Sequence, residues 1–348
     1  PDSLVEMTKS IADKKGKKGW IITLDYPIYI PFITYSEERE LRKEITLAFG
    51  KRGYQKNKNN NTEIIIEIIS LRKERAKLLG YNSHAEFILE ERMANSVSEV
   101  KKFLEELAIK AFPAAEKEWM AMNTYAKSKL NLKKIEKWDS AFVSEKMKKA
   151  ELDLDELELK PFFSLDNVLS GIFEIVKKLY DLEFKENYDI QRYNNEVRVF
   201  EVYKNTKFYA LLYADFFPRP GKRDGAWMTS FRSQKKNQRP HVSIVCNFSR
   251  PTKTKPSLLT FQEVTTLFHE FGHALHGILA NTSYSSLSGT NVYWDFVELP
   301  SQIMENWCYE KEALLIYAKH YKTGKALPRK FIEKIKKIKN FQQGLHTL

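Results

Sequence analysis

Apolar residues recur every three or four positions along most of the chain. This spacing is typical of helices that bury one face, because a helix turns once in about 3.6 residues. It predicts helices at residues 37–50, 63–79, 84–93, 97–130, 165–179, 260–279 and 294–317. Gly80 directly follows the second of these segments and predicts its end, since glycine readily adopts the conformation that terminates helices. The chain is therefore predicted to be mainly helical.

A different pattern occupies residues 182–249. Apolar residues there alternate with polar ones or run together, and many are β-branched or aromatic, as in strands. The predicted strands span residues 197–203, 208–214, 227–231 and 242–248. Residues 217–225, between the second and third strands, are rich in proline and glycine and predict a long turn. The fold class that follows is mainly α with a small β-sheet.

The length predicts two lobes, because the chain has 348 residues and domains average about 150. We expect a helical segment over residues 1–155 and a second segment over residues 156–348, which holds the sheet and the helices after it. The sequence begins at Pro1 without an initiator methionine and stops shortly after Gly344 without a tail-like composition. We therefore expect it to be an internal segment of a longer protein.

Charge and hydropathy exclude several protein classes. Lys and Arg number 57 against 45 Asp and Glu, which gives a formal net charge of +12, but the basic residues are dispersed along the chain. Dispersed lysines usually form solvated helix faces, so we expect no nucleic-acid partner. No apolar run approaches the roughly 20 residues of a membrane helix, and the first residues do not form a signal peptide. We expect no membrane association.

The cysteines indicate the compartment. Cys246 and Cys308 cannot form a disulfide framework in a chain of this size, and no CxxC pair is present to hold a metal. This usage favours a reducing environment. We therefore expect a cytoplasmic location, and a periplasmic one stays open because we expect the natural N-terminus to lie outside the sequence.

One motif indicates chemistry: His269-Glu270-Phe271-Gly272-His273, an HExxH sequence inside the predicted helix 260–279. Histidines four residues apart lie one turn above each other on the same helix face and can bind a single ion. Glu270 is turned by about 100° from His269 and can hold a water as a general base. Thr260 and Glu263 have the spacing of a capping box, which supports a helix start there. The alternative is two buried histidines without a metal.

A catalytic zinc needs a third protein ligand and one open position. A downstream histidine of the HExxHxxGxxH pattern is excluded, because position 276 is His276 and position 279 is Leu279. Glu298 stands 25 residues after His273 at the start of the next predicted helical segment, 294–308, and His2Glu sites are completed in this way. Glu298 is the predicted third ligand, and the expected cofactor is Zn²⁺, although Co²⁺ or Mn²⁺ fit similar ligands.

Two further residues share the faces that point to this site. His276 lies seven residues after His269, and its role is a hydrogen-bonded structural one or a contact with substrate or zinc. Glu305 lies seven residues after Glu298. Ligating histidines usually donate their second N–H to a carboxylate, so Glu305 is a candidate partner for one of them, with a solvated surface role as the alternative.

These residues resemble the thimet oligopeptidase family of zinc peptidases, which includes neurolysin, oligopeptidase A and the dipeptidyl carboxypeptidase Dcp. The resemblance is carried by residues 268–276 (FHEFGHALH), 288–290 (SGT) and 295–302 (DFVELPSQ), and it extends through residues 26–35, 71–81, 213–231, 245–248 and 320–321. It therefore covers nearly the whole chain. Residues 287–291 and 295–298 are most similar to the dipeptidyl carboxypeptidase branch.

The resemblance implies a zincin-like, neurolysin-like body with two helical lobes and a deep channel that admits short unstructured peptides. It implies a zinc metallopeptidase in which His269, His273 and Glu298 bind the metal and Glu270 is the base. The implied reaction is release of C-terminal dipeptides by a monomer. The predicted strand 242–248 would be the sheet edge along which the peptide lies.

Other substrate contacts follow from the same resemblance. Gly289, in the 288–290 string, is a candidate for substrate contact. Dipeptide release also needs a cation for the free C-terminal carboxylate, and surface charges near the 217–225 turn offer several. They are Arg219, Lys222, Arg223, Arg232 and His241. Family members are nearly twice as long, and a later segment supplies His and Tyr residues that bind substrate and stabilise the oxyanion. This chain alone is therefore expected to lack those donors.

Three alternatives remain beside the dipeptidyl carboxypeptidase. The first is an endo-oligopeptidase of the same family. The second is an inactive fragment that binds peptides without turnover. The third is a basic scaffold for polyanions, which predicts binding that weakens steeply with salt.

Overall fold

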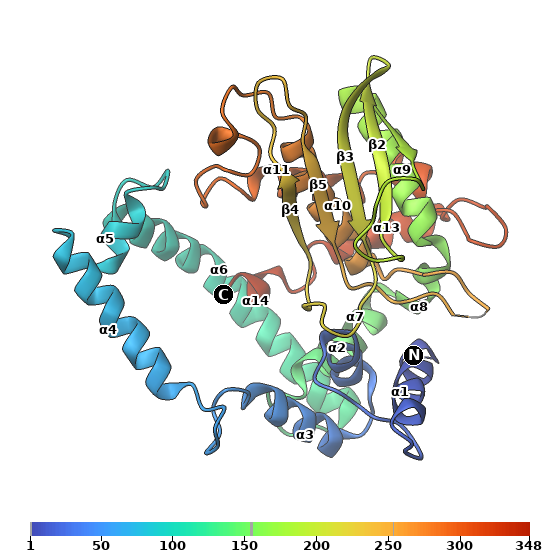
Figure 1. The fold of residues 1–348 in the computed structure, drawn as a ribbon. Helices are drawn as coiled ribbons and strands as arrows, with labels where there is room; N and C mark the ends of the chain where they lie inside the picture. The colour runs from blue at the N-terminus through green and yellow to red at the C-terminus, as the bar shows by residue number, and fades with distance from the viewer. Residues whose placement is uncertain (1, 154–155, 253) are drawn as a thin grey trace. The chain divides into compact units, whose positions relative to one another are not determined.

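The computed structural model describes residues 2–153, 156–252 and 254–348, which form two compact units (Figure 1). The first unit comprises the described residues up to Asp153 together with Asn340–Leu348, and the second comprises those between them. The sequence places residues 340–348 with the second segment. They instead belong to the first unit, where α14 (Gln343–Thr347) packs on α6 (Val97–Leu130). Gly344 permits this approach, because a Cβ there would lie 2.5 Å from the Ala115 nitrogen.

The first unit is helical. Its other helices are α1 (Asp2–Lys14), α2 (Tyr26–Tyr35), α3 (Arg39–Gly50), α4 (Thr62–Leu78), α5 (His84–Leu89) and α7 (Ser140–Leu152). Ser83 and Ser96 begin α5 and α6, since the side chain of each accepts a hydrogen bond from a backbone N–H in the first turn. The apolar spacing predicts α3, α4, α5 and α6 to within a few residues. It does not predict α2, which is apolar almost throughout, or α7.

A buried ion network joins helices of this unit. Asp139 is fully buried and accepts hydrogen bonds from Arg39 and Arg42, and the Arg42 side chain is only 2% exposed. Burial by itself would raise the pKa of Asp139. Hydrogen bonds from Arg39, the Glu136 N–H and Arg42 outweigh burial and hold that pKa below its ordinary value. The carboxylate therefore stabilises the folded unit above its unfolded pKa, and this stabilisation is lost as the pH falls through the folded pKa.

Replacing Asp139 with alanine is expected to lower the free energy of unfolding of the first unit by about 3–5 kcal/mol, because Arg42 becomes a buried charge without a carboxylate partner. Denaturant unfolding followed by circular dichroism measures the change. Asp13→Ala is the matched control, since Asp13 pairs with Lys9 in an exposed i,i+4 bridge and its loss should cost less than about 0.5 kcal/mol. Equal effects of the two substitutions would contradict the buried network.

The second unit is built on a five-stranded sheet with the strand order β1-β2-β3-β5-β4. The strands are β1 (Leu182–Glu186), β2 (Arg198–Lys204), β3 (Lys207–Asp215), β4 (Trp227–Arg232) and β5 (His241–Val245). Only β3 and β5 pair in parallel. The expectation that the 242–248 strand is the sheet edge is wrong, because β5 lies between β3 and β4. Val242 to Val245 are all buried, as a strand covered on both faces requires, whereas β4 is partly exposed and forms the edge.

Helices cover this sheet and continue beyond it (Figure 1). They are α8 (Glu156–Leu159), α9 (Leu165–Tyr180), α10 (Phe261–Ile278), α11 (Leu299–Glu305), α12 (Lys311–Tyr317) and α13 (Arg329–Ile338), with short 3₁₀ turns at Lys160–Phe162, Ser285–Leu287 and Asn306–Cys308. α10 packs on β5 and β4, and Gly277 permits the close approach, because a Cβ there would lie 2.6 Å from the Met228 side chain and 2.9 Å from that of Val242. None of the described helices combines the length and the apolar composition that crossing a bilayer requires.

The single helix predicted over residues 294–317 is wrong. The structure begins α11 only at Leu299, because Pro300 favours the first turn of a helix, where its missing N–H costs nothing. The segment breaks again after Cys308, and α12 starts at Lys311. The buried Tyr317 hydroxyl donates a hydrogen bond to the Cys308 carbonyl and so satisfies one of the backbone groups that the break leaves unpaired. The helical spacing of apolar residues continues across both breaks, so the sequence pattern does not reveal them.

Candidate metal centre

The helix α10 holds both histidines of the HExxH motif. Thr260 and Glu263 form the expected capping box: the Thr260 side chain accepts from the Glu263 N–H, and the Glu263 carboxylate accepts from the Thr260 N–H. His269, Glu270 and His273 of this helix line a cavity that the start of β4 and the residues before α11 also border. His269 and His273 lie one turn apart on the helix, with ring centroids 4.9 Å apart.

A glycine allows α11 to approach α10. A Cβ on Gly272 would lie 2.6 Å from the Pro300 carbonyl oxygen and 2.6 Å from the Ser301 Cα, both of them backbone atoms. Only glycine therefore fits between these two helices. Glu298 is the residue that precedes α11, so this close contact sets the distance between its carboxylate and the histidines.

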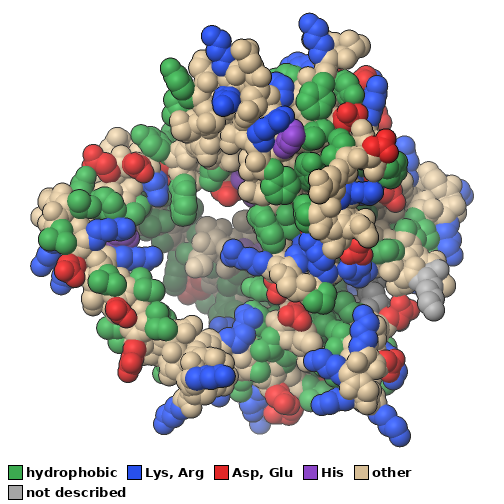
Figure 2. Space-filling model, viewed as in Figure 1, with side chains coloured by type: hydrophobic (Ala, Val, Ile, Leu, Met, Phe, Trp, Pro, Cys, Tyr) green, Lys and Arg blue, Asp and Glu red, His purple; other side chains and the backbone are tan. Residues whose placement is uncertain are grey.

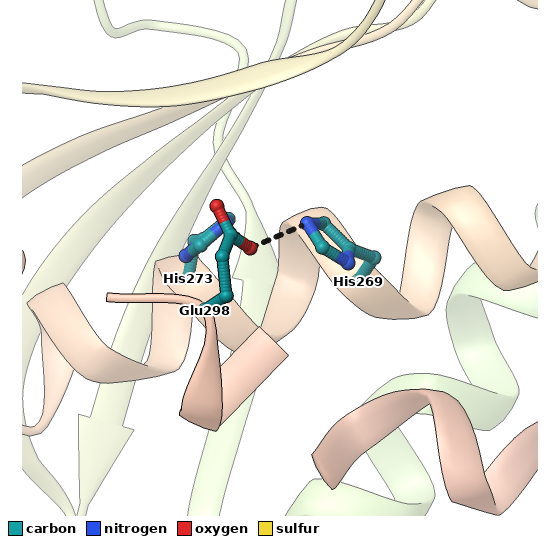
Figure 3. A group of neighbouring side chains, drawn as sticks. All are labelled: His269, His273 and Glu298. Atoms are coloured by element: carbon teal, nitrogen blue, oxygen red, sulfur yellow. Dashed lines mark ion pairs between the residues drawn. The ribbon is translucent and has the colours of Figure 1, made fainter. Parts of the chain in front are cut away.

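The three predicted ligands meet at one point (Figure 3). Glu298 Oε2 lies 3.1 Å from Nε2 of His269 and 3.1 Å from Nε2 of His273. The Ser301 hydroxyl donates a 2.8 Å hydrogen bond to the same oxygen and orients the carboxylate. Ligands about 2.0 Å from a tetrahedral metal stand roughly 3.3 Å apart, so the carboxylate distances fit such an ion after a small adjustment.

The hydrogen bonding of His269 also fits a cation. Its Nδ1 lies 2.7 Å from Glu305 Oε1, and a hydrogen bond between these atoms requires the proton on Nδ1. In the neutral imidazole the other nitrogen, Nε2, then presents a lone pair to the Glu298 carboxylate. A divalent cation between the two acceptors would stabilise this arrangement, and the carboxylate on Nδ1 is the partner that metal-ligating histidines usually have.

Glu270 lies in the same cavity as these three residues. Its side chain is 5% exposed, and its Oε2 is buried without a hydrogen-bond partner among the described residues. Burial is the main cause that raises the pKa of Glu270 to about 7; Glu298 raises it further and His269 opposes the shift. The cavity is lined by Ala226, Trp227, Met228, His269, Glu270, His273, Thr290, Val297 and Glu298.

The remaining candidate residues differ in whether they contact the metal-site residues or the cavity. Glu305 contacts His269, as its predicted role requires. His276 is half-buried beside Phe296 and does not line the cavity. Gly289 has a φ of 58° and packs against Gly277 of α10, one residue before Thr290 in the cavity wall. His241 is the first residue of β5, opposite Arg232 at the far end of β4, and is not brought to the cavity.

The sequence reasoning did not single out the cavity wall on the sheet side. Trp227 and Met228 begin β4 and face the histidines across the cavity. Thr290 and Val297 come from the segment between α10 and α11. A strand signal at residues 227–231 and the 288–290 string were both visible, but which strand lies beside α10 depends on the sheet order. No spacing rule along the chain supplies that order.

Gly272→Ala is expected to weaken metal binding at least about tenfold, because the added methyl group displaces the Pro300–Ser301 backbone and, with it, Glu298. Metal affinity is measured by competition with a chromophoric chelator. Gly50→Ala is the control, since Gly50 is also a helical residue, the last of α3, but a Cβ there meets no atom within 4 Å. Unchanged affinity in Gly272→Ala would show that the helix contact does not set the ligand geometry.

Glu305→Gln is expected to weaken metal binding by roughly 10–100-fold, because the amide orients His269 but no longer supports its basicity with a negative charge. The same chelator competition measures this effect. The matched variant is Glu312→Gln, which makes the same chemical change at an exposed position of α12. A comparable loss in both variants would point to general electrostatics instead of the contact with His269.

The comparisons with known proteins identify the family. Residues 32–348 match the sequence profile of Peptidase family M3. The chain is 38% identical to oligopeptidase A of Salmonella typhimurium, with 100% of this chain and 53% of that protein aligned. It is 34% identical to the dipeptidyl carboxypeptidase of Escherichia coli, with 98% and 51% aligned. It is 31% identical to saccharolysin of Saccharomyces cerevisiae, with 100% and 51% aligned.

The chain spans about half the length of the curated relatives it matches. The family profile nevertheless covers almost all of this chain, including His269, His273 and Glu298. The chain belongs to peptidase family M3.

Proposed function

We propose that the full-length protein is a zinc-dependent metallopeptidase that hydrolyses short, unstructured peptides. The observation that carries this proposal is the convergence of His269, His273 and Glu298 on one point, with the buried carboxylate of Glu270 in the same cavity. Three ligands of this kind leave one position open, as in catalytic rather than structural zinc sites. A zinc ion held there supplies Lewis-acid polarisation of the scissile carbonyl and lowers the pKa of a water.

Glu270 moves the proton in this mechanism. Its carboxylate accepts a proton from the water that attacks the scissile carbonyl, and it then gives the proton to the amide nitrogen as the C–N bond breaks. No covalent bond forms between substrate and protein. His269 is held in position by Glu305, and Ser301 holds Glu298, so these ligands are oriented before substrate binds.

β4 is the proposed platform for the peptide. It is an edge strand, and its first residues line the cavity beside Glu270 and His269. An extended peptide can add to such an edge through main-chain hydrogen bonds, which require no particular side chains. Binding of this kind selects unstructured peptides over folded proteins.

The proposed reaction is release of C-terminal dipeptides. An endopeptidase reaction is the second candidate, because the identity to oligopeptidase A (38%) is higher than that to dipeptidyl carboxypeptidase (34%). Hydrolysis of one N-acetylated peptide as the free acid and as the C-terminal amide separates the two. A dipeptide-releasing enzyme should cleave the acid much faster, whereas equal rates would establish the endopeptidase.

The cofactor is tested separately by elemental analysis of the purified full-length protein. We expect close to one zinc per chain and loss of hydrolysis after removal with a chelator. Restoration of activity by Zn²⁺ would complete the assignment. Full activity of the metal-free protein would refute it.

A further inference from the structure

The loop between β3 and β4 is held by several side-chain hydrogen bonds. Asp215, at the end of β3, is buried and accepts two hydrogen bonds from Arg219 and one from Lys222. The Lys222 side chain is 3% exposed, and its ammonium also donates to the carbonyls of Phe217 and Cys246. These bonds tie the loop to the ends of both β3 and β5.

Asn247 fixes the part of the loop nearest the cavity. Its side-chain amide donates to the Arg223 carbonyl at 2.9 Å and to the Gly225 carbonyl at 2.8 Å. Gly225 has a φ of 96°, a conformation that glycine adopts without strain, and Ala226 follows directly as a cavity residue. The backbone of Arg223 is therefore held in place three residues before Ala226, which lines the cavity.

Arg223 differs from the other cations near this loop. Arg219 and Lys222 are engaged with Asp215, and Arg232 donates to the Arg239 carbonyl. The side chain of Arg223 is exposed and forms no salt bridge within the described residues. Figure 2 shows basic side chains scattered over the visible face among acidic and apolar ones. Exposed positive charges are common on this face. Arg223 is distinguished by its place on the fixed loop, three residues before Ala226.

Distance along the chain selects Arg223 among these cations. In an extended peptide the terminal carboxylate lies two residues beyond the cleaved bond, or roughly 7 Å. Arg232 lies at the other end of β4, four residues beyond Met228 and therefore about 13 Å from it, and His241 of β5 pairs with Arg232. Arg223 is three residues before Ala226, at most about 11 Å from it, and has a long side chain that can reach back.

We propose that Arg223 binds the C-terminal carboxylate of the substrate and so sets the cut two residues from the end. The inference rests on the proposed function and deepens it. It implies that the peptide runs antiparallel to β4, with its C-terminus at the end of the strand where β4 begins. Because Lys222 and Asn247 hold the loop in advance, the arginine meets the carboxylate with little loss of backbone freedom.

The test uses the full-length zinc-loaded protein and N-acetylated tetra-alanine as its acid and its amide. Arg223→Ala is expected to raise KM for the acid by roughly 10–100-fold and to leave the amide unchanged, since one charge-assisted hydrogen-bond pair is lost. Arg223→Lys should restore part of the difference. Binding of dialanine as acid and as amide, measured by calorimetry, gives the same comparison without turnover. Arg232→Ala is the matched control.

The possible outcomes distinguish the assignment of Arg223 from the proposed release of dipeptides. Loss of the preference for the acid in Arg223→Ala, with normal zinc content and a normal Arg232→Ala, supports the inference. A wild-type preference that survives in Arg223→Ala, or that disappears in Arg232→Ala, overturns the assignment of Arg223 while dipeptide release stands. Equal cleavage of the acid and the amide by the wild-type protein would refute dipeptide release, and the assignment of Arg223 would be refuted with it.

Discussion

The Glu270→Gln variant is expected to keep its metal, while its kcat/KM falls by about 10²–10⁴-fold, the range that general-base catalysis contributes. The amide fills the same buried space next to His269 but cannot accept a proton from the attacking water. Because the metal would be held by His269, His273 and Glu298, zinc content should stay near one per chain. Elemental analysis and peptide hydrolysis by the full-length protein measure the two quantities on one sample.

The matched control is Glu312→Gln, the same chemical change at an exposed site on α12. It should leave both zinc content and hydrolysis unchanged. Loss of zinc from Glu270→Gln would mean that the carboxylate holds the metal and is not the base. Turnover near the wild-type level would remove Glu270 from the mechanism.

The helices that sequence predicts well are those whose apolar stripe and end signals agree. α10 is an example: its apolar residues from Phe261 to Phe271 recur at helical spacing, and Thr260 with Glu263 marks its start. The region after it shows the opposite. The apolar residues from 294 to 317 keep the helical period, but Pro300 and the turn after Cys308 divide the segment into separate pieces. A period in sequence reports which face is buried and does not report where hydrogen bonding is interrupted.

The candidate site likewise combines features that the sequence predicts with features that it does not. The two histidines and Glu270 follow from spacing within one helix, because helix geometry places residues four apart on the same face. The meeting of Glu298 with them depends on Gly272, whose missing side chain lets α11 approach, and that contact is invisible without the structure. The order of β4 and β5 is likewise a long-range property. Consequently the sequence predicts which residues come together at the centre and misassigns the strand that borders it.

His269→Ala is expected to lower metal affinity by more than the roughly 100-fold that loss of an orienting partner costs, because it removes one of three direct ligands. It also leaves the Glu305 carboxylate without the imidazole that it contacts. Zinc content after dialysis should therefore fall from about one per chain to near zero. Elemental analysis measures it, and circular dichroism verifies that the helices remain.

Two histidine variants make this result specific. His276→Ala changes the same helix about two turns after His269, at a residue that does not line the cavity, and His346→Ala changes an exposed histidine of the first unit. Both should keep their zinc. If His276→Ala lost the metal and His269→Ala retained it, the centre would lie one turn away from the point where Glu298 meets the helix, and the Gly272 contact would no longer explain the site. Retention by all three variants would instead remove α10 as the source of the ligands, because the remaining His273 and Glu298 cannot by themselves complete a tight three-ligand site.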